Sequence, residues 1–135
     1  MNDGQRFTFK KEERVTGEKR IENLFTNGSA FIAYPFRVVF LETEASTRFP
    51  LSVLVSIPKK RIRSAVKRNR MKRLVREAYR LNKHLFHDEE IPENYHLDVA
   101  FIYVKEELSE YETVEKAVRK TMNELIKHVR EKEQC

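Results

Sequence analysis

The residues best suited to chemistry in this chain are lysines and arginines gathered in its middle. Residues 59–76 hold ten basic side chains and no acidic one. An arginine presents a planar set of donors that can grip two phosphate oxygens, and a lysine supplies a mobile positive charge. Asn69, between Arg68 and Arg70, can both donate and accept, which suits a base edge or a ribose 2′-hydroxyl. The candidate nucleic-acid-binding residues are Lys59, Lys60, Arg61, Arg63, Lys67, Arg68, Asn69, Arg70, Lys72, Arg73 and Arg76.

The charge of the whole chain supports this interpretation once it is divided by position. The 135 residues include 27 Lys and Arg against 21 Asp and Glu, a net charge of +6. Without the ten cations of residues 59–76, 17 basic residues face 21 acidic ones, a net charge of −4. Positive charge focused in one segment of an otherwise acidic chain is typical of a polyanion binder, most often of nucleic acid.

Other classes of protein are not favoured. No apolar run reaches the roughly 20 residues that cross a bilayer, and the first residues lack the apolar core of a secretory signal. The only cysteine is Cys135, which excludes an internal disulfide and a thiolate zinc site. We therefore expect a cytoplasmic protein that does not bind membranes.

The sequence predicts no catalytic site and no metal site. His84 and His87 precede Asp88, Glu89 and Glu90, and this polar stretch is typical of a solvated helix end rather than of a ligand set. The chain has no Gly-rich phosphate loop and no Cys/His pair that could act as nucleophile and base. Nothing in these patterns indicates that the isolated chain is catalytic.

The elements that precede the basic segment are predicted from periodicity. Residues 16–27 form a short amphipathic helix, with Thr16 as its N-cap and Gly28 as a left-handed residue that ends it. Residues 31–42 and 51–57 then alternate as strands do, and the simplest interpretation is an antiparallel pair joined by a polar loop.

From Ala65 the helical period returns. One face of this helix is basic, and the other carries an apolar stripe of Met71, Leu74, Val75, Ala78, Leu81 and Leu85. Residues 97–104 form a strand that is apolar on both faces and therefore central. Ser109 and Glu112 predict a capping box that opens a final helix. Its buried face consists of Val114, Ala117, Val118, Met122, Leu125, Ile126 and Val129.

This order, α-β-β-(β)-α-β-α, predicts one α+β domain over residues 1–135, with helices packed on a small, mostly antiparallel sheet. Residues 1–13 and 131–135 are expected to be flexible.

The ordered pattern Ala-x-x-Arg-Asn-Arg-x-Lys-Arg-x-x-Arg, over Ala65 to Arg76, resembles the signature helix of the bacterial ribonuclease P protein component. Upstream, the family's first-helix pattern of Arg, apolar positions, Phe and Gly is matched. The matching residues there are Arg14, Ile21, Leu24, Phe25 and Gly28. In element order the resemblance covers residues 14–130.

The resemblance implies a protein subunit of a ribonucleoprotein endonuclease that removes the 5′ leader of precursor tRNA. Hydrolysis is carried out by the large RNA subunit with Mg²⁺, which is bound mainly by that RNA, and the basic helix lies against this RNA. A cleft between the first helix and the sheet holds the single-stranded leader, and the candidates to line it are Phe25, Phe36 and Phe40. The implied fold is like that of ribosomal protein S5 domain 2, a sandwich of helices and sheet with a left-handed βαβ crossover. No obligate protein partner is implied.

Alternatives stay open at this point. For Phe36 and Phe40, a place in the core is as well supported as leader contact. A non-catalytic structural RNA binder, such as a ribosomal protein or RNA chaperone, would also need a basic helix. A DNA-binding regulator fits less well, because groove-reading helices usually follow another helix and a turn, whereas this one follows a strand.

Overall fold

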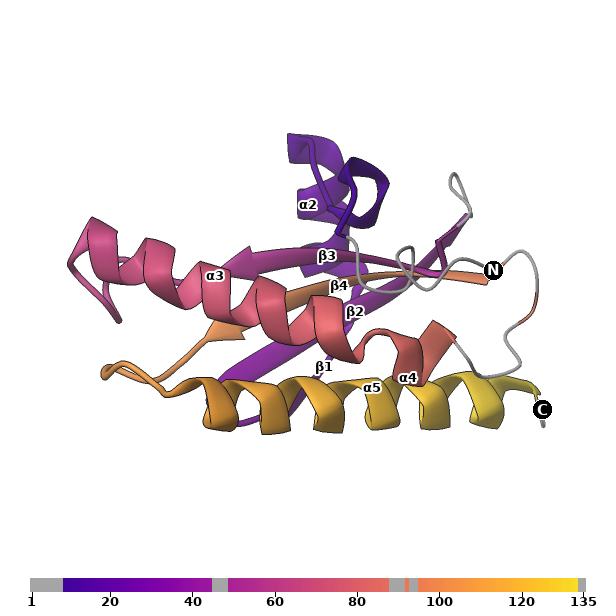
Figure 1. Ribbon diagram of the computed structural model, residues 1–135. Helices are drawn as coiled ribbons and strands as arrows, with labels where there is room; N and C mark the ends of the chain where they lie inside the picture. Colours follow the sequence, from indigo (N-terminus) through magenta and orange to yellow (C-terminus); the bar gives the residue numbers. More distant parts are fainter. Residues whose placement is uncertain (1–8, 45–48, 88–91, 93–94, 134–135) are drawn as a thin grey trace.

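Four strands form one mixed sheet in the order β1-β2-β4-β3 (Figure 1). β1 (Ser29–Ala33) pairs antiparallel with β2 (Phe36–Glu44), and β2 pairs antiparallel with β4 (Tyr95–Tyr103). β3 (Leu51–Ser56) lies parallel to β4. The computed structural model describes residues 9–44, 49–87, 92 and 95–133.

The helices flank this sheet. A single turn, η1 (Lys11–Glu13), precedes α2 (Glu18–Asn27), and α3 (Ala65–Asn82) is followed by the short α4 (His84–His87). α5 (Tyr111–Glu133) is the longest and runs beside α3 in Figure 1. Within the described part of the chain, no helix is long and apolar enough to span a membrane. The predicted α+β class is confirmed, and the additional strand arises because a turn at Tyr34 and Pro35 divides the strand predicted over residues 31–42 into β1 and β2.

The two faces of the sheet bury different side chains. Alternation along β2 places Phe36, Val38 and Phe40 on the face that α3 and α5 cover, where the larger core lies. The residues of β2 that alternate with these three point toward the opposite face of the sheet. On that second face, a smaller cluster of Val15, Leu24, Val39 and Ala100 packs under α2. The second face is therefore only partly covered.

The strand pairing differs from the expected hairpin. β2 and β3 do not pair, because β4 lies between them and pairs with both. β4 is buried along nearly its whole length, as its apolar residues on both faces predicted. Placing this strand in the centre buries both of its faces and leaves β1 and β3 at the two edges. The parallel β3–β4 pair makes β3-α3-α4-β4 a crossover unit, whose left-handed sense stays a prediction.

The junction of α2 with β1 depends on a glycine, for a reason other than the expected one. Gly28 has φ −76°, an ordinary value, so it is not a left-handed residue. A Cβ built there would lie 2.4 Å from the carbonyl oxygen of Leu24 and 2.8 Å from Cγ1 of Val39. Gly28 is thus required for space. The N-cap of α2 is Gly17 at φ 93°, not Thr16.

The segment before α2 packs on the domain within the part of residues 1–13 that the structure describes, residues 9–13. Glu13 is fully buried and pairs with the buried Lys83, which caps the end of α3. Phe9 packs edge-on against Tyr79 with ring centroids 5.7 Å apart. Residues 1–8 lie outside the described part. At the other terminus α5 continues through Glu133, beyond the expected end of order, and residues 134–135 are not described.

The final helix is anchored as its pattern predicts, although its start is displaced. All seven residues of its predicted apolar face are buried. The helix begins at Tyr111, and the Thr113 and Val114 amides bond to the Glu110 carbonyl, so Ser109 is not its N-cap. The Ser109 hydroxyl instead lies 2.7 Å from the Tyr103 hydroxyl at the end of β4.

Candidate nucleic-acid interface

The basic helix α3 is fixed to the domain by its apolar stripe. Met71, Val75 and Ala78 of the predicted stripe are fully buried, whereas Leu74, Leu81 and Leu85 are partly buried. Tyr79 and Asn82 are buried on the same side, which the hydropathy pattern did not predict. The α3 N-cap is Ser64, whose hydroxyl accepts from the Lys67 amide at 3.3 Å. The apolar side of α3 is thus held against the core of the domain, and its first turn is capped.

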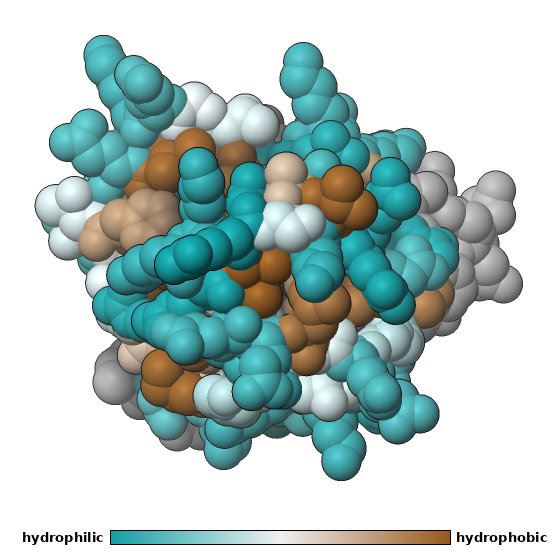
Figure 2. Space-filling view, turned by 90° about the vertical axis from the view of Figure 1, so that its left-hand side faces the viewer, coloured by the Kyte–Doolittle hydropathy of each residue, from teal (hydrophilic) through white to brown (hydrophobic). Residues whose placement is uncertain are grey.

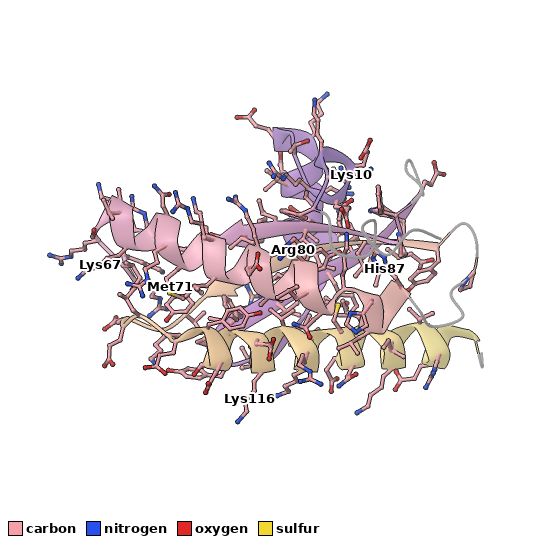
Figure 3. The ribbon with its side chains drawn as sticks, in the orientation of Figure 1. Lys10, Lys67, Met71, Arg80, His87 and Lys116 are labelled. Carbon is pink, nitrogen blue, oxygen red and sulfur yellow. The ribbon has the colours of Figure 1, made fainter. Side chains whose placement is uncertain are left out.

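The opposite side of α3 presents its cations to solvent. Of the eleven predicted residues, Arg61, Arg68 and Lys72 are half-buried. The others are exposed, namely Lys59, Lys60, Arg63, Lys67, Asn69, Arg70, Arg73 and Arg76. In Figure 3, Lys67 extends outward at one end of α3 while Met71 points toward the interior. The predicted set therefore lies in the loop before α3 and along α3 as far as Arg76, and most of its side chains are accessible to a partner.

The accessible positive charge of α3 ends near Arg76. Beyond it, Arg80 makes two hydrogen bonds to Glu77, from Nε to Oε2 at 3.1 Å and from Nη2 to Oε1 at 2.6 Å. The hydrogen bond from Arg80 lowers the pKa of Glu77, so this carboxylate stays charged and neutralises its partner. Arg80 is consequently a poorer phosphate ligand than Arg70 or Arg73, for which the structure describes no ion pair.

Arg68, the first arginine of the Arg-Asn-Arg run, also shapes the loop before the helix. Its Nη1 donates to the carbonyl oxygens of Ile62 and Arg63 at 3.0 and 2.8 Å. These bonds hold the loop that carries Lys59, Lys60 and Arg61 against the start of α3. Its guanidinium therefore positions neighbouring cations in addition to adding its own charge.

Of the three aromatic residues expected to line a cleft beside the first helix, Phe36 and Phe40 are buried, which favours the alternative that they belong to the core. Phe36 is 0% exposed and packs edge-on against Phe101 and Tyr103. Phe40 is 9% exposed and contacts His128 of α5, with ring centroids 4.8 Å apart. Both lie on the face covered by α3 and α5, whereas α2 packs on the other face. Strand alternation separated the two faces but did not show which one α2 covers.

Phe25 differs from these two, since it lies on α2 and is 43% exposed. The sheet face under α2 also carries accessible apolar residues that were not predicted as part of a site. Ile32 is 55% exposed, and Leu41, Leu54 and Ile102 are partly exposed around the buried cluster. We call Phe25, Ile32, Leu41, Leu54 and Ile102 the open face. The exposed Arg37 pairs with both Ile32 and Ile102 in the sheet register and so lies among them.

An ion pair fixes α2 above this face. Arg20 donates from Nε to Oδ2 of Asp98 at 2.9 Å and from Nη2 to Oδ1 at 2.6 Å. His96 Nε2 lies 3.1 Å from the same Oδ1. Burial alone would raise the pKa of Asp98, but the hydrogen bonds from His96 and Arg20 outweigh it and lower the pKa. The carboxylate therefore stays ionised where α2 meets the centre of the sheet.

The part of the chain that the structure describes contains no group of three His, Cys, Asp or Glu side chains that could hold a metal ion. His84 and His87 lie in the short α4, whereas Asp88, Glu89 and Glu90 lie outside the described residues.

The sequence of this chain is similar to those of proteins of a known family. The family model Ribonuclease P matches residues 9–129. The chain belongs to the ribonuclease P protein family. The ribonuclease P protein component of Porphyromonas gingivalis is 46% identical over 123 residues, which cover 90% of this chain and 89% of the relative. That of Chlorobium phaeobacteroides is 36% identical over 105 residues, 72% of each chain.

Solved ribonuclease P proteins share the fold. The Thermotoga maritima protein aligns with a TM-score of 0.63 at 23% identity and covers 83% of this chain and 96% of its own. The Staphylococcus aureus protein gives 0.61 at 18% identity, with 87% and 97% covered. At such identities the likeness concerns the fold, which these ribonuclease P proteins and this chain have in common.

Proposed function

We propose that this chain is the protein subunit of a ribonuclease P ribonucleoprotein, which removes the 5′ leader of precursor tRNA. The observation that carries the proposal is the helix that contains Arg68, Asn69 and Arg70. Its apolar side is buried in the domain and its basic side is exposed. The chain that carries it belongs to the ribonuclease P protein family. A cytoplasmic location follows from the proposal, because precursor tRNA is processed where it is transcribed in a cell without a nucleus.

The catalytic RNA is the proposed partner of the basic side of α3 and its preceding loop. A rigid helix holds its cations at fixed spacing, so little conformational entropy is lost when they meet a phosphate backbone. Asn69 lies among them, exposed, and can reach a base edge or a 2′-hydroxyl. We propose all eleven residues as this interface, with Arg68 acting partly by holding the loop.

The open face is the proposed site of the single-stranded leader. Phe25 offers an exposed aromatic ring on which an unpaired base can stack, at about 1–3 kcal/mol per base. The partly exposed Ile32, Leu41 and Ile102 offer apolar contact beside it, and Arg37 offers a positive charge for the leader backbone. These residues replace Phe36 and Phe40, which are buried on the opposite face.

Phosphodiester hydrolysis is assigned in this proposal to the RNA subunit, with Mg²⁺ held mainly by RNA phosphates. When bound, the metal supplies an activated water for the attack on phosphorus. The contribution of the chain is to bind and orient: its cations fix the catalytic RNA, and its open face holds the leader in line with the cleavage site. No residue of the chain is proposed as a nucleophile or general base.

Reconstitution tests the proposal. The chain is mixed with a bacterial ribonuclease P RNA and precursor tRNA at low Mg²⁺, and cleavage and substrate affinity are measured with and without protein. We expect faster cleavage and tighter, leader-dependent substrate binding. If the chain binds the RNA but improves neither quantity, the alternative of a structural RNA binder replaces this proposal.

A further inference from the structure

A cavity lies where the loop before α3 meets the connection between β4 and α5. Its volume is about 590 Å³, and it is lined by Lys60, Arg61, Ile62, Arg63, Ser64, Lys67, Glu106, Glu107 and Leu108. We call it the loop pocket. Figure 2 views the molecule from this end and shows hydrophilic side chains around exposed apolar surface. The volume lies in the range of sites that bind small organic ligands.

One wall of the loop pocket is cationic. Lys60, Arg63 and Lys67 are exposed, and among the described residues none of them forms an ion pair. Arg61 lies 3.7 Å from the Glu106 carboxylate across the pocket. Three unneutralised cations around one cavity favour an anionic group there, and a phosphate best matches such a set of donors.

The opposite wall of the loop pocket is acidic and partly apolar. Glu107 is exposed, Glu106 faces Arg61, and Leu108 is 37% exposed beside them. Carboxylates repel phosphates, so a continuous nucleic-acid backbone does not fit across the whole pocket. A ligand with a phosphate at one end, an apolar face in the middle and N–H donors at the other end does fit. An unpaired nucleotide has these three parts.

Side-chain hydrogen bonds hold both walls in place. Arg68 binds the Ile62 and Arg63 carbonyls of the cationic wall. On the acidic wall, the Tyr103 hydroxyl donates to the Glu107 carbonyl and contacts the Ser109 hydroxyl. The pocket is therefore preorganised, which lowers the entropy cost of binding a ligand in it.

We propose that the loop pocket binds one unpaired guanine nucleotide of an RNA. Its phosphate lies against Lys60, Arg63 and Lys67, and its base lies along Leu108 with its edge toward Glu107. Guanine presents two adjacent donors, N1–H and the 2-amino group, to a carboxylate that can accept both. The proposal rests on the proposed function in that the nucleotide belongs to the RNA bound by α3.

The test compares guanosine with inosine, which lacks only the 2-amino group. Two short oligouridine RNAs, one with a central guanosine and one with a central inosine, are titrated against the full chain by fluorescence anisotropy. Because a hydrogen bond to a charged group is strong, we expect the guanosine RNA to bind about tenfold more tightly. Glu107→Gln should reduce this ratio to less than about twofold, whereas Glu112→Gln, an equal charge change on the exposed side of α5, should preserve it.

Equal affinity of the wild-type chain for the two RNAs overturns the pocket proposal, as does an unchanged ratio in Glu107→Gln. Melting temperatures of both variants are measured first, and since both side chains are exposed we expect no shift. Binding of the catalytic RNA is measured separately. If the chain does not bind the catalytic RNA, the proposed function is wrong, but the preference for guanosine over inosine still tests the pocket proposal. The two failures are therefore distinguishable.

Discussion

Arg20 and Asp98 form a two-pronged ion pair that joins α2 to the middle of the sheet. The two residues are 78 positions apart in the chain, and the Asp98 carboxylate is buried while Arg20 is only partly so. His96 contacts the same carboxylate, and its other ring nitrogen lies 2.9 Å from the Phe49 carbonyl. The placement of α2, the helix that carries Phe25, therefore depends on charges beneath it.

Arg20→Ala should destabilise the domain by about 2 kcal/mol, because it leaves the Asp98 carboxylate buried with His96 alone. Breaking a fully buried pair costs about 3–5 kcal/mol, and partial exposure of Arg20 reduces this. Urea unfolding at neutral pH measures the change, with Arg20→Lys as a control that keeps the charge but loses the paired geometry and so shows a smaller loss. A loss under about 0.5 kcal/mol would contradict this assignment.

The same pair predicts a pH dependence. The pKa of Asp98 is lowered in the folded chain, so its contribution to stability is fully present above the ordinary aspartate value of about 3.9 and is lost as the pH falls through the folded value. The stability difference between the wild type and Arg20→Ala should therefore be largest near neutral pH and shrink below about pH 4. Urea unfolding at a series of pH values checks this, and a difference that grows on acidification would contradict it.

The buried pair of Glu13 and Lys83 predicts strong coupling between the first described residues and the end of α3. Lys83→Met should cost about 3–5 kcal/mol of unfolding free energy, because the buried Glu13 carboxyl group loses its partner in the interior. The double variant Glu13→Leu with Lys83→Met should recover most of that loss. A double-mutant cycle by urea unfolding measures the coupling, and additive single losses would show that the two charges are independent.

The basic helix and the final helix could be predicted because their evidence is local: a few consecutive turns contain both the apolar stripe and its opposite face. Positions that depend on distant contacts could not. The place of β4 between β2 and β3, the burial of Phe36 under α5 and the pairing of Glu13 with Lys83 all join residues far apart in the chain. Periodicity shows that alternate residues share a face, but only packing decides which helix covers it.

Gly28 illustrates the same limit at one residue. Its position after the first helix was predicted, yet the reason lies in Val39 and Phe40 of a strand that packs against it. The open face was missed for a similar reason: Ile32, Leu54 and Ile102 come from three strands and share one face only in the folded sheet.

Salt dependence separates the cations that contact RNA from those that do not. Arg73→Ala should reduce the slope of log affinity against log salt by somewhat less than one unit, since one phosphate contact is lost. Arg68→Ala should reduce it further, because the loop that carries Arg61 and Arg63 is released as well. Arg80→Ala is the matched control, since Glu77 already neutralises Arg80. Filter binding to the catalytic RNA measures the slopes, and equal effects of Arg73→Ala and Arg80→Ala would exclude this interface.

Replacement by Ala should affect different properties at Phe25 and Phe36: leader binding at the first and stability at the second. Phe25→Ala removes an exposed ring, so unfolding should change by less than about 0.5 kcal/mol, while affinity for precursor tRNA with a leader falls by about 1–3 kcal/mol. Affinity for mature tRNA, which has no leader, should be unchanged. Phe36→Ala leaves a cavity beside Phe101 and should cost about 3–5 kcal/mol of stability. If Phe25→Ala weakens binding of both tRNA forms equally, its ring does not contact the leader.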